Sequence, residues 1–353
     1  MMAREAAKPY PMAGRLTILV AVLLCAPGLQ CRAAVTRAAA AVLRLDPALD
    51  SILSPDANLQ TFLERDSIFD GPAWVRDGNS GYLIFSDVPG NVIDKLSPDG
   101  KVSVLLGNIF GGGDRSRAYE SLGLEGQKKF RMPGADGITL DPQGRIVYCA
   151  YSDGRIVRLE ADRTRTVLAN RFAGRRINAP NDLVYGSDGS LYFTDSRAAT
   201  KHANGEGVPH EGLYVLRGGK VLLLSKSIDH PNGLAFSPHE RYLYVTDTRR
   251  KNVLRFDMRA GAVANGKVFV DMSGGDEAGA PDGIKVDRRG NVYATGPGGV
   301  WIVSPAGTHV GTIRTPAKAT NIAFGGKDFT YLYVTAFGAL YRIRLRAAGR
   351  QPL

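Results

Sequence analysis

The sequence has few of the residues that several common enzyme classes need. Its 353 residues include only three cysteines, and two of them, Cys25 and Cys31, lie in the N-terminal segment. Removal of that segment would leave Cys149 alone, which excludes an intramolecular disulfide and a thiolate metal site. The chain also lacks a G-x-S-x-G motif, so it offers no serine nucleophile of the α/β-hydrolase kind.

A nucleic-acid site is also missing from the pattern of charge. The formal net charge is +11, but the basic residues are scattered, with only short clusters such as 249–251. Proteins that bind single strands or duplexes gather their basic residues into stripes, often interleaved with aromatic side chains. We therefore expect no nucleic-acid partner.

The N-terminal residues have the pattern of a secretory signal. Three basic residues up to Arg15 precede an apolar run from Leu16 to Leu24, which is too short to span a bilayer. Small residues near Cys31 offer cleavage sites, so we expect a signal peptide at 1–34 and a lead-in segment at 35–55. The mature protein is then periplasmic or secreted, without stable membrane insertion. An uncleaved membrane anchor is the alternative, because an apolar run alone does not prove cleavage.

One short motif recurs along the rest of the chain. It consists of an Asn or Asp, often after Pro, followed by an apolar run, as in PNGLAF from Pro231. The six copies begin at Asp70, Asp136, Asn181, Asn232, Asp282 and Asn321. Their intervals are 66, 45, 51, 50 and 39 residues, and a repeat of this length indicates a propeller or a solenoid.

Each copy precedes further strand-like runs. After the copy at Asn181 come GSLYFTD, GLYVLR and VLLLS, each rich in β-branched or aromatic residues. Six such units predict an all-β fold, a six-bladed β-propeller with four-stranded blades over residues 56–347. The last unit lacks a fourth run, while NLQTFLE at 58–64 precedes the first copy. We therefore expect this N-terminal strand to close the last blade.

The innermost strands of a propeller line its central tunnel and run in one direction. The six repeated Asn and Asp residues should consequently form a ring at one mouth of the tunnel. Each one alone is explained as a turn residue, but six at one position favour a binding role. Amide and carboxylate oxygens without Cys or His suit a hard divalent cation, and calcium fits best. Magnesium, zinc and manganese remain alternatives.

These motifs resemble a known family. PNDLVYGSDGSLYFTD, PNGLAFSP, PDGIKVDRRGNVYATGPGGVW and NIAFGG, in this order, resemble the family of senescence marker protein (regucalcin), gluconolactonase and luciferin-regenerating enzyme. The resemblance covers residues 45–345 and implies one catalytic divalent ion at the tunnel mouth. It implies metal ligands at Asp70, Asn181, Asn232 and Asp282. Asp70 departs from the family, which has the longer Glu there, and this puts full activity in doubt.

The resemblance implies an exported, metal-dependent lactone hydrolase of gluconolactonase type. A metal ion at the mouth polarises the lactone carbonyl and activates water. We expect Asp282 to be both a metal ligand and the catalytic base, although a purely coordinating role is the alternative. Asn181 and His230, which lies beside the ring, are expected to contact the substrate. For His230 the alternative is an ordinary surface loop.

Residues outside the ring allow two interpretations. Asp195 and Asp247 end second strands, where they either orient the Asn ligands or cap backbone amides of their own turns; the recurrence at Asp87 favours caps. Two long connections, 107–133 and 196–211, should overhang the site. Their basic residues are Arg115, Arg117, Lys128, Lys129 and Lys201.

A basic rim favours an acidic or polyhydroxylated substrate such as a sugar-acid lactone, unless these residues are only solvated charge. Two other functions stay open at this point. One is a non-catalytic binding propeller that a metal ion stabilises, since one fold hosts many functions. The other is an aryl-ester or organophosphate hydrolase with the same metal site.

Overall fold

The computed structural model describes residues 36–39, 42–111, 114–121, 129–196, 207–274 and 277–350. Contacts divide the chain into two units, Met1–Cys31 and Arg32–Leu353, and the first unit lies outside the described residues. The predicted signal peptide, residues 1–34, lies outside them too. No helix within the described ranges is long and apolar enough to cross a membrane.

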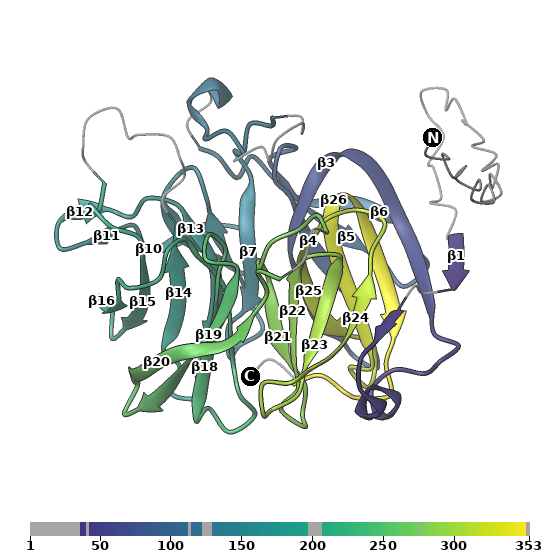
Figure 1. The fold of residues 1–353 in the computed structure, drawn as a ribbon. Helices are drawn as coiled ribbons and strands as arrows, with labels where there is room; N and C mark the ends of the chain where they lie inside the picture. Colours follow the sequence, from purple (N-terminus) through teal and green to yellow (C-terminus); the bar gives the residue numbers. More distant parts are fainter. Residues whose placement is uncertain are drawn as a thin grey trace, which may run out of the picture. The chain divides into compact units, whose positions relative to one another are not determined.

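The described residues of the second unit form an all-β, propeller-like arrangement of antiparallel sheets (Figure 1). The largest sheet contains β25 (Ala319–Gly325), β26 (Tyr331–Arg344), β3 (Asn58–Asp77), β4 (Ser80–Asp87), β5 (Val92–Leu96) and β6 (Val102–Gly107), with β1 (Thr36–Ala39) paired to β3. A five-stranded sheet contains β2 (Val42–Arg44), β24 (His309–Arg314), β23 (Gly299–Val303), β22 (Val292–Gly296) and β21 (Ile284–Val286).

Three sheets have four strands each. The first contains β7 (Ala135–Leu140), β8 (Ile146–Ala150), β9 (Arg155–Leu159) and β10 (Arg165–Ala169). The second contains β13 (Pro180–Tyr185), β14 (Leu191–Asp195), β15 (Gly212–Arg217) and β16 (Lys220–Ser225). The third contains β17 (Pro231–Phe236), β18 (Tyr242–Asp247), β19 (Asn252–Arg259) and β20 (Ala262–Asp271). A small hairpin, β11 (Arg171–Phe172) with β12 (Arg175–Arg176), and two short 3₁₀ helices, η1 (Pro47–Ser51) and η2 (Arg115–Arg117), complete the described elements.

The inner strands surround a common centre. They contact one another in the closed order β3, β7, β13, β17, β21, β25 and back to β3. Inner strands such as β17 are buried along their whole length, whereas outer strands such as β6 and β16 are largely exposed. Inner strands are buried because each one packs against its own sheet and against the neighbouring inner strands. Each repeat motif therefore lies at the start of a buried inner strand.

The prediction of six separate blades is wrong in its count: the described residues form five large sheets, not six. The cause is β3, which runs unbroken for 20 residues. Its first part pairs with β26 between Leu59 and Ile68, and its second part pairs with β4 from Phe69 onward. The segment 58–64 therefore does pair with the last strand of the chain, as predicted, but it also joins the first and last repeats into one sheet.

Buried hydroxyl groups tie each inner strand to its neighbour. Near the end of four second strands, a Ser or Thr donates a hydrogen bond to a backbone carbonyl at the start of the neighbouring repeat. The pairs are Ser86 with Asp136 (2.9 Å), Thr194 with Asn232 (2.6 Å), Thr246 with Asp282 (2.6 Å) and Thr295 with Thr320 (3.0 Å). Cys149 stands at the corresponding place in β8, one residue before its end. These bonds fix the depth at which each motif residue lies.

We expect Thr246→Val to lower the free energy of unfolding by about 1 kcal/mol, because it removes the donor to the Asp282 carbonyl without changing side-chain shape. That carbonyl keeps its bond from the Gly233 amide at 3.1 Å, which limits the loss. Urea unfolding followed by tryptophan fluorescence measures the difference. Thr246→Ser keeps the hydroxyl and should stay closer to the wild type; equal stability of all three proteins would contradict the role of this bond.

Candidate functional site

Five repeated polar side chains meet at one mouth of the ring of inner strands. Asp70, Asp136, Asn181 and Asn232 are each at least 92 % buried, and Asp282 is partly buried just before β21. The Asn181 amide donates to Asp136 Oδ2 at 3.0 Å. Asp136 in turn shares a side-chain hydrogen bond with Asp70.

The other side of this ring is held in the same way. The Asn232 side chain hydrogen-bonds to the Asp282 carboxyl group, and the charge of Asp282 raises the pKa of Asp136. Asp70 also interacts electrostatically with Asp282. The structure therefore brings together all four ligands that the family resemblance implied, with Asp136 as a fifth member.

Burial makes these carboxyl groups resist ionisation. Desolvation raises the pKa of Asp70 to about 6, although hydrogen bonds from Gly71 and Asn321 oppose the shift. Desolvation, reinforced by the charge of Asp70, raises the pKa of both Asp136 and Asp282 well above the ordinary range. Crowded carboxyl groups of this kind gain most from a positive charge placed between them. A positive charge bound in the ring would therefore favour the ionised form of these carboxyl groups.

The donor set fits a hard divalent cation. Asn232 Oδ1 is buried and has no hydrogen-bond partner among the described residues, while its Nδ2 donates to Thr248 Oγ1 at 3.3 Å. Thr248 Oγ1 donates onward to the Pro281 carbonyl at 2.7 Å, which fixes the amide. Carboxylate and amide oxygens are ligands that calcium accepts in flexible geometry. Within the described ranges no group of three or more His, Cys, Asp and Glu is arranged to hold a metal alone, so the Asn amides are needed.

Asn321 does not occupy the ring position that its sequence motif predicted. In four repeats, the last residue of the second strand pairs with a residue of the inner strand, and the ring residue comes directly after that inner-strand residue. Asn181, for example, follows Pro180, which pairs with Asp195. In β25 the corresponding pair is Ala319 with Ala336, so Thr320 takes the ring position. Asn321 lies one residue deeper and donates from Nδ2 to Asp70 Oδ1 at 3.0 Å.

His230 lies beside the ring in a constrained conformation. Its backbone has a left-handed φ of 68°, and its side chain is buried. Glu211 accepts the His230 backbone N–H at 2.6 Å, and its carboxylate lies 3.7 Å from Nδ1. The residue is therefore not the exposed loop residue that the alternative described, and its contact with substrate stays a prediction.

The carboxylates at the ends of second strands accept hydrogen bonds from backbone amides, but most of these amides precede the ring residues and do not belong to the carboxylates' own turns. Asp195 accepts from the backbone N–H groups of Asn178 and Ala179, at 3.1 and 2.6 Å. Asp247 accepts from those of Asp229 and Arg250, at 2.8 and 3.1 Å. These bonds fix the two or three residues before Asn181 and Asn232, so the caps position the ring without touching its side chains.

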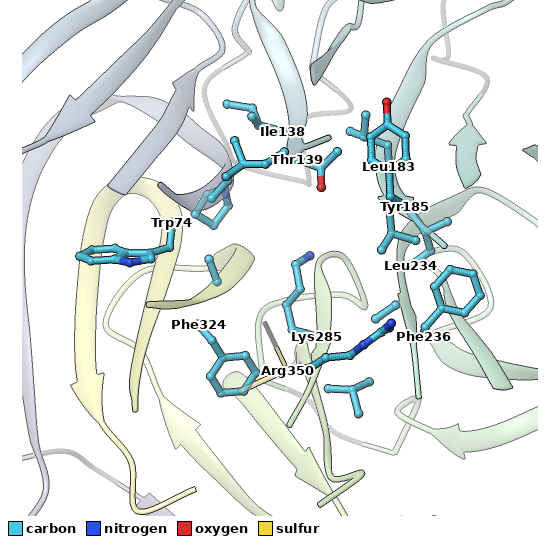
Figure 2. A pocket seen from close by; sticks show the side chains of 17 residues that line it. Trp74, Ile138, Thr139, Leu183, Tyr185, Leu234, Phe236, Lys285, Phe324 and Arg350 are labelled. Carbon is cyan, nitrogen blue, oxygen red and sulfur yellow. The ribbon is translucent and has the colours of Figure 1, made fainter. Parts of the chain in front are cut away.

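The central channel continues below the ring as a small apolar cavity. Its volume is about 110 Å³, and its walls come from residues two to four positions after the motifs, such as Ile138, Leu183 and Phe236. Figure 2 shows Lys285 and Arg350 reaching into this space between apolar side chains. Lys285 Nζ lies 3.6 Å from Asp182, a buried carboxylate directly below the ring. This ion pair could not be predicted from the repeats, because Lys285 has no counterpart at the same position in the other copies.

The predicted basic rim is described only in part. Arg115, Arg117 and Lys129 are exposed, whereas Lys128 and Lys201 lie outside the described residues. Tyr119 from the same connection packs edge-on against Tyr151, with ring centroids 5.8 Å apart. The Tyr119 hydroxyl donates to the Asn178 carbonyl, so this connection touches the segment before Asn181.

Fold and site together define a β-propeller-like protein with a ring of buried oxygen donors at one mouth of its channel. The family model described as SMP-30/Gluconolactonase/LRE-like region matches residues 69–338, so the chain belongs to this family.

Individual relatives agree with this assignment. The chain is 29 % identical over 322 residues to a gluconolactonase of Zymomonas mobilis, covering 87 % of each protein. It is 30 % identical over 244 residues to a pentonolactonase of Haloferax volcanii, covering 61 % of this chain and 77 % of the relative. The solved structure of a gluconolactonase from Xanthomonas campestris has a TM-score of 0.72 at 29 % identity, covering 88 % of this chain and 97 % of that one.

We expect Thr248→Val to weaken calcium binding by about 10- to 100-fold, because the Asn232 amide loses the acceptor that orients its Oδ1 into the ring. Thr248→Ser keeps the hydroxyl and serves as the matched control. Isothermal titration calorimetry of chelator-stripped protein measures both. Equal affinity in the valine and serine variants would show that Thr248 does not orient this ligand.

Proposed function

We propose that this protein is an exported, divalent-metal-dependent lactone hydrolase of gluconolactonase type. The observation that supports this most directly is the ring itself, which combines crowded, buried carboxyl groups with the buried Asn232 Oδ1, an oxygen that has no hydrogen-bond partner among the described residues. Family membership and the lactonase relatives agree with the substrate class. Calcium is the expected ion because all donors are oxygens.

Asp70, Asn181, Asn232 and Asp282 would hold the ion. When bound, the ion supplies Lewis-acid polarisation of the lactone carbonyl and favours ionisation of water. Asp282 is the residue best placed to take the proton from the attacking water, since it is the ring carboxylate that is only partly buried. Asn181, which belongs to the ring, and His230, which lies beside it, are the proposed substrate contacts. The Gly71 backbone amide and the Asn321 side chain donate hydrogen bonds to Asp70 Oδ1. These bonds fix the position of this carboxylate, which is shorter than the Glu of the family, as a metal ligand.

Turnover of D-glucono-1,5-lactone tests this proposal. Mature protein stripped with chelator should be inactive, and calcium should restore activity more fully than magnesium, zinc or manganese. Asp282→Asn should lower kcat/KM by about 10²- to 10⁴-fold, because it removes the base. A pH-stat assay measures the acid released.

The matched control for that assay is Asp328→Asn, which changes an exposed carboxylate between β25 and β26. It should match the wild type. Turnover that ignores chelator would contradict the metal-dependent mechanism. Metal binding without turnover on any lactone would favour a non-catalytic binding propeller. Turnover confined to aryl esters or organophosphates would favour a hydrolase of those substrates.

The location of the protein is a separate prediction. The apolar run at 16–24 after basic residues supports export with cleavage near residue 34. Expression of the full chain in a bacterial host, followed by fractionation and mass spectrometry of the N-terminus, measures both. An intact N-terminus in the membrane fraction would instead show an anchored protein.

A further inference from the structure

A second layer of residues lies at the mouth, two positions before each ring residue. It comprises Ile68, Gly134, Ala179, His230, Ala280 and Lys318. Only His230 and Lys318 have polar side chains in this layer. They belong to the repeats on either side of β21, so Asp282 lies between them. Lys318 lies outside the repeated motifs.

Lys318 is fixed at this position by its surroundings. Its Nζ lies over the ring of Phe337, 4.8 Å from the centroid, and its carbonyl accepts the Phe337 backbone N–H at 2.9 Å. The ammonium interacts electrostatically with Asp282 and Asp70, and no carboxylate of the described residues lies within ion-pair distance of it. Among the described residues, the Lys318 ammonium is therefore a cation close enough to the ring to act on its carboxyl groups, and none of these residues accepts a hydrogen bond from it.

A cavity adjoins Lys318. It has a volume of about 270 Å³ and lies among loops that all end at the mouth, with Lys318 as part of its wall. Glu277 and Arg314, which form an ion pair of 2.9 Å, also line it, as do Gly298 and Gly299. Its size and polar rim suit a hydroxylated chain of several carbons.

We propose that Lys318 is a catalytic residue that contacts the ester group of the bound lactone, with the remainder of the lactone lying in the cavity beside it. This inference rests on the proposed function. Hydrolysis adds water across the ester bond, and negative charge develops on the ester oxygens before the acid is released. An ammonium held beside the ring stabilises that charge. The substrate class is thus a lactone with a hydroxylated side chain, which reaches past the metal position toward Glu277 and Arg314.

The test compares Lys318→Met, Lys318→Arg and Lys327→Met with the wild type. Lys327 is an exposed lysine between β25 and β26 and serves as the matched control. Lys318→Met should lower kcat by about 10²- to 10³-fold on D-glucono-1,5-lactone, while Lys318→Arg should recover part of the loss. Lys327→Met should leave both kcat and KM unchanged.

Calcium affinity supplies a second readout that does not depend on turnover. Because the ammonium repels a cation in the ring, Lys318→Met should bind calcium more tightly, on the order of tenfold, by calorimetry. A wild type that hydrolyses no lactone would sink the proposed function. An active wild type with kcat unchanged in Lys318→Met would overturn this inference alone, as would loss of kcat that comes with unfolding in circular dichroism.

Discussion

The structure depends on the crowding of carboxyl groups at one mouth of the channel. Asp70 and Asp136 are buried, Asp282 is partly buried, and all three interact electrostatically; desolvation and this crowding raise the pKa of each carboxyl group. A fold keeps such an arrangement only when something compensates for it. Here the compensation is incomplete within the described residues, because Lys285 pairs with Asp182 below the ring and Lys318 stands off above it. In the proposed function, a divalent cation bound in the ring would complete it.

The inner strands and the hydrogen bonds between repeats hold these groups in place. Each inner strand brings one polar residue to the same depth, and a hydroxyl from the neighbouring repeat fixes the carbonyl of most of them. Asp195 and Asp247 then pin the backbone just before Asn181 and Asn232. The ring is consequently rigid before any ligand arrives, which keeps low the cost of ordering it on binding.

Much of this could be predicted from the sequence, because a repeated motif places its residues at equivalent positions. That reasoning located Asp70, Asn181, Asn232 and Asp282 and the pairing of segment 58–64 with β26. It failed at Asn321, because in the last copy the Asn lies one position later in the strand register and Thr320 takes the ring position.

Other features had no repeated signal to reveal them. Strand continuity through β3, which merges two repeats into one sheet, depends on backbone geometry that composition does not encode. Thr248, Lys285 and Lys318 come from single positions whose importance appears only when the mouth is assembled. Residues that act through a neighbour's position are in general the hardest to predict from one sequence.

The most direct test of the account is a crystal structure grown with calcium in excess. The account predicts one ion at the mouth, bound at about 2.3–2.6 Å by oxygens of Asp70, Asn181, Asn232 and Asp282, with at least one coordination position open toward Lys318. An empty ring at saturating calcium, or an ion bound elsewhere on the chain, would contradict it.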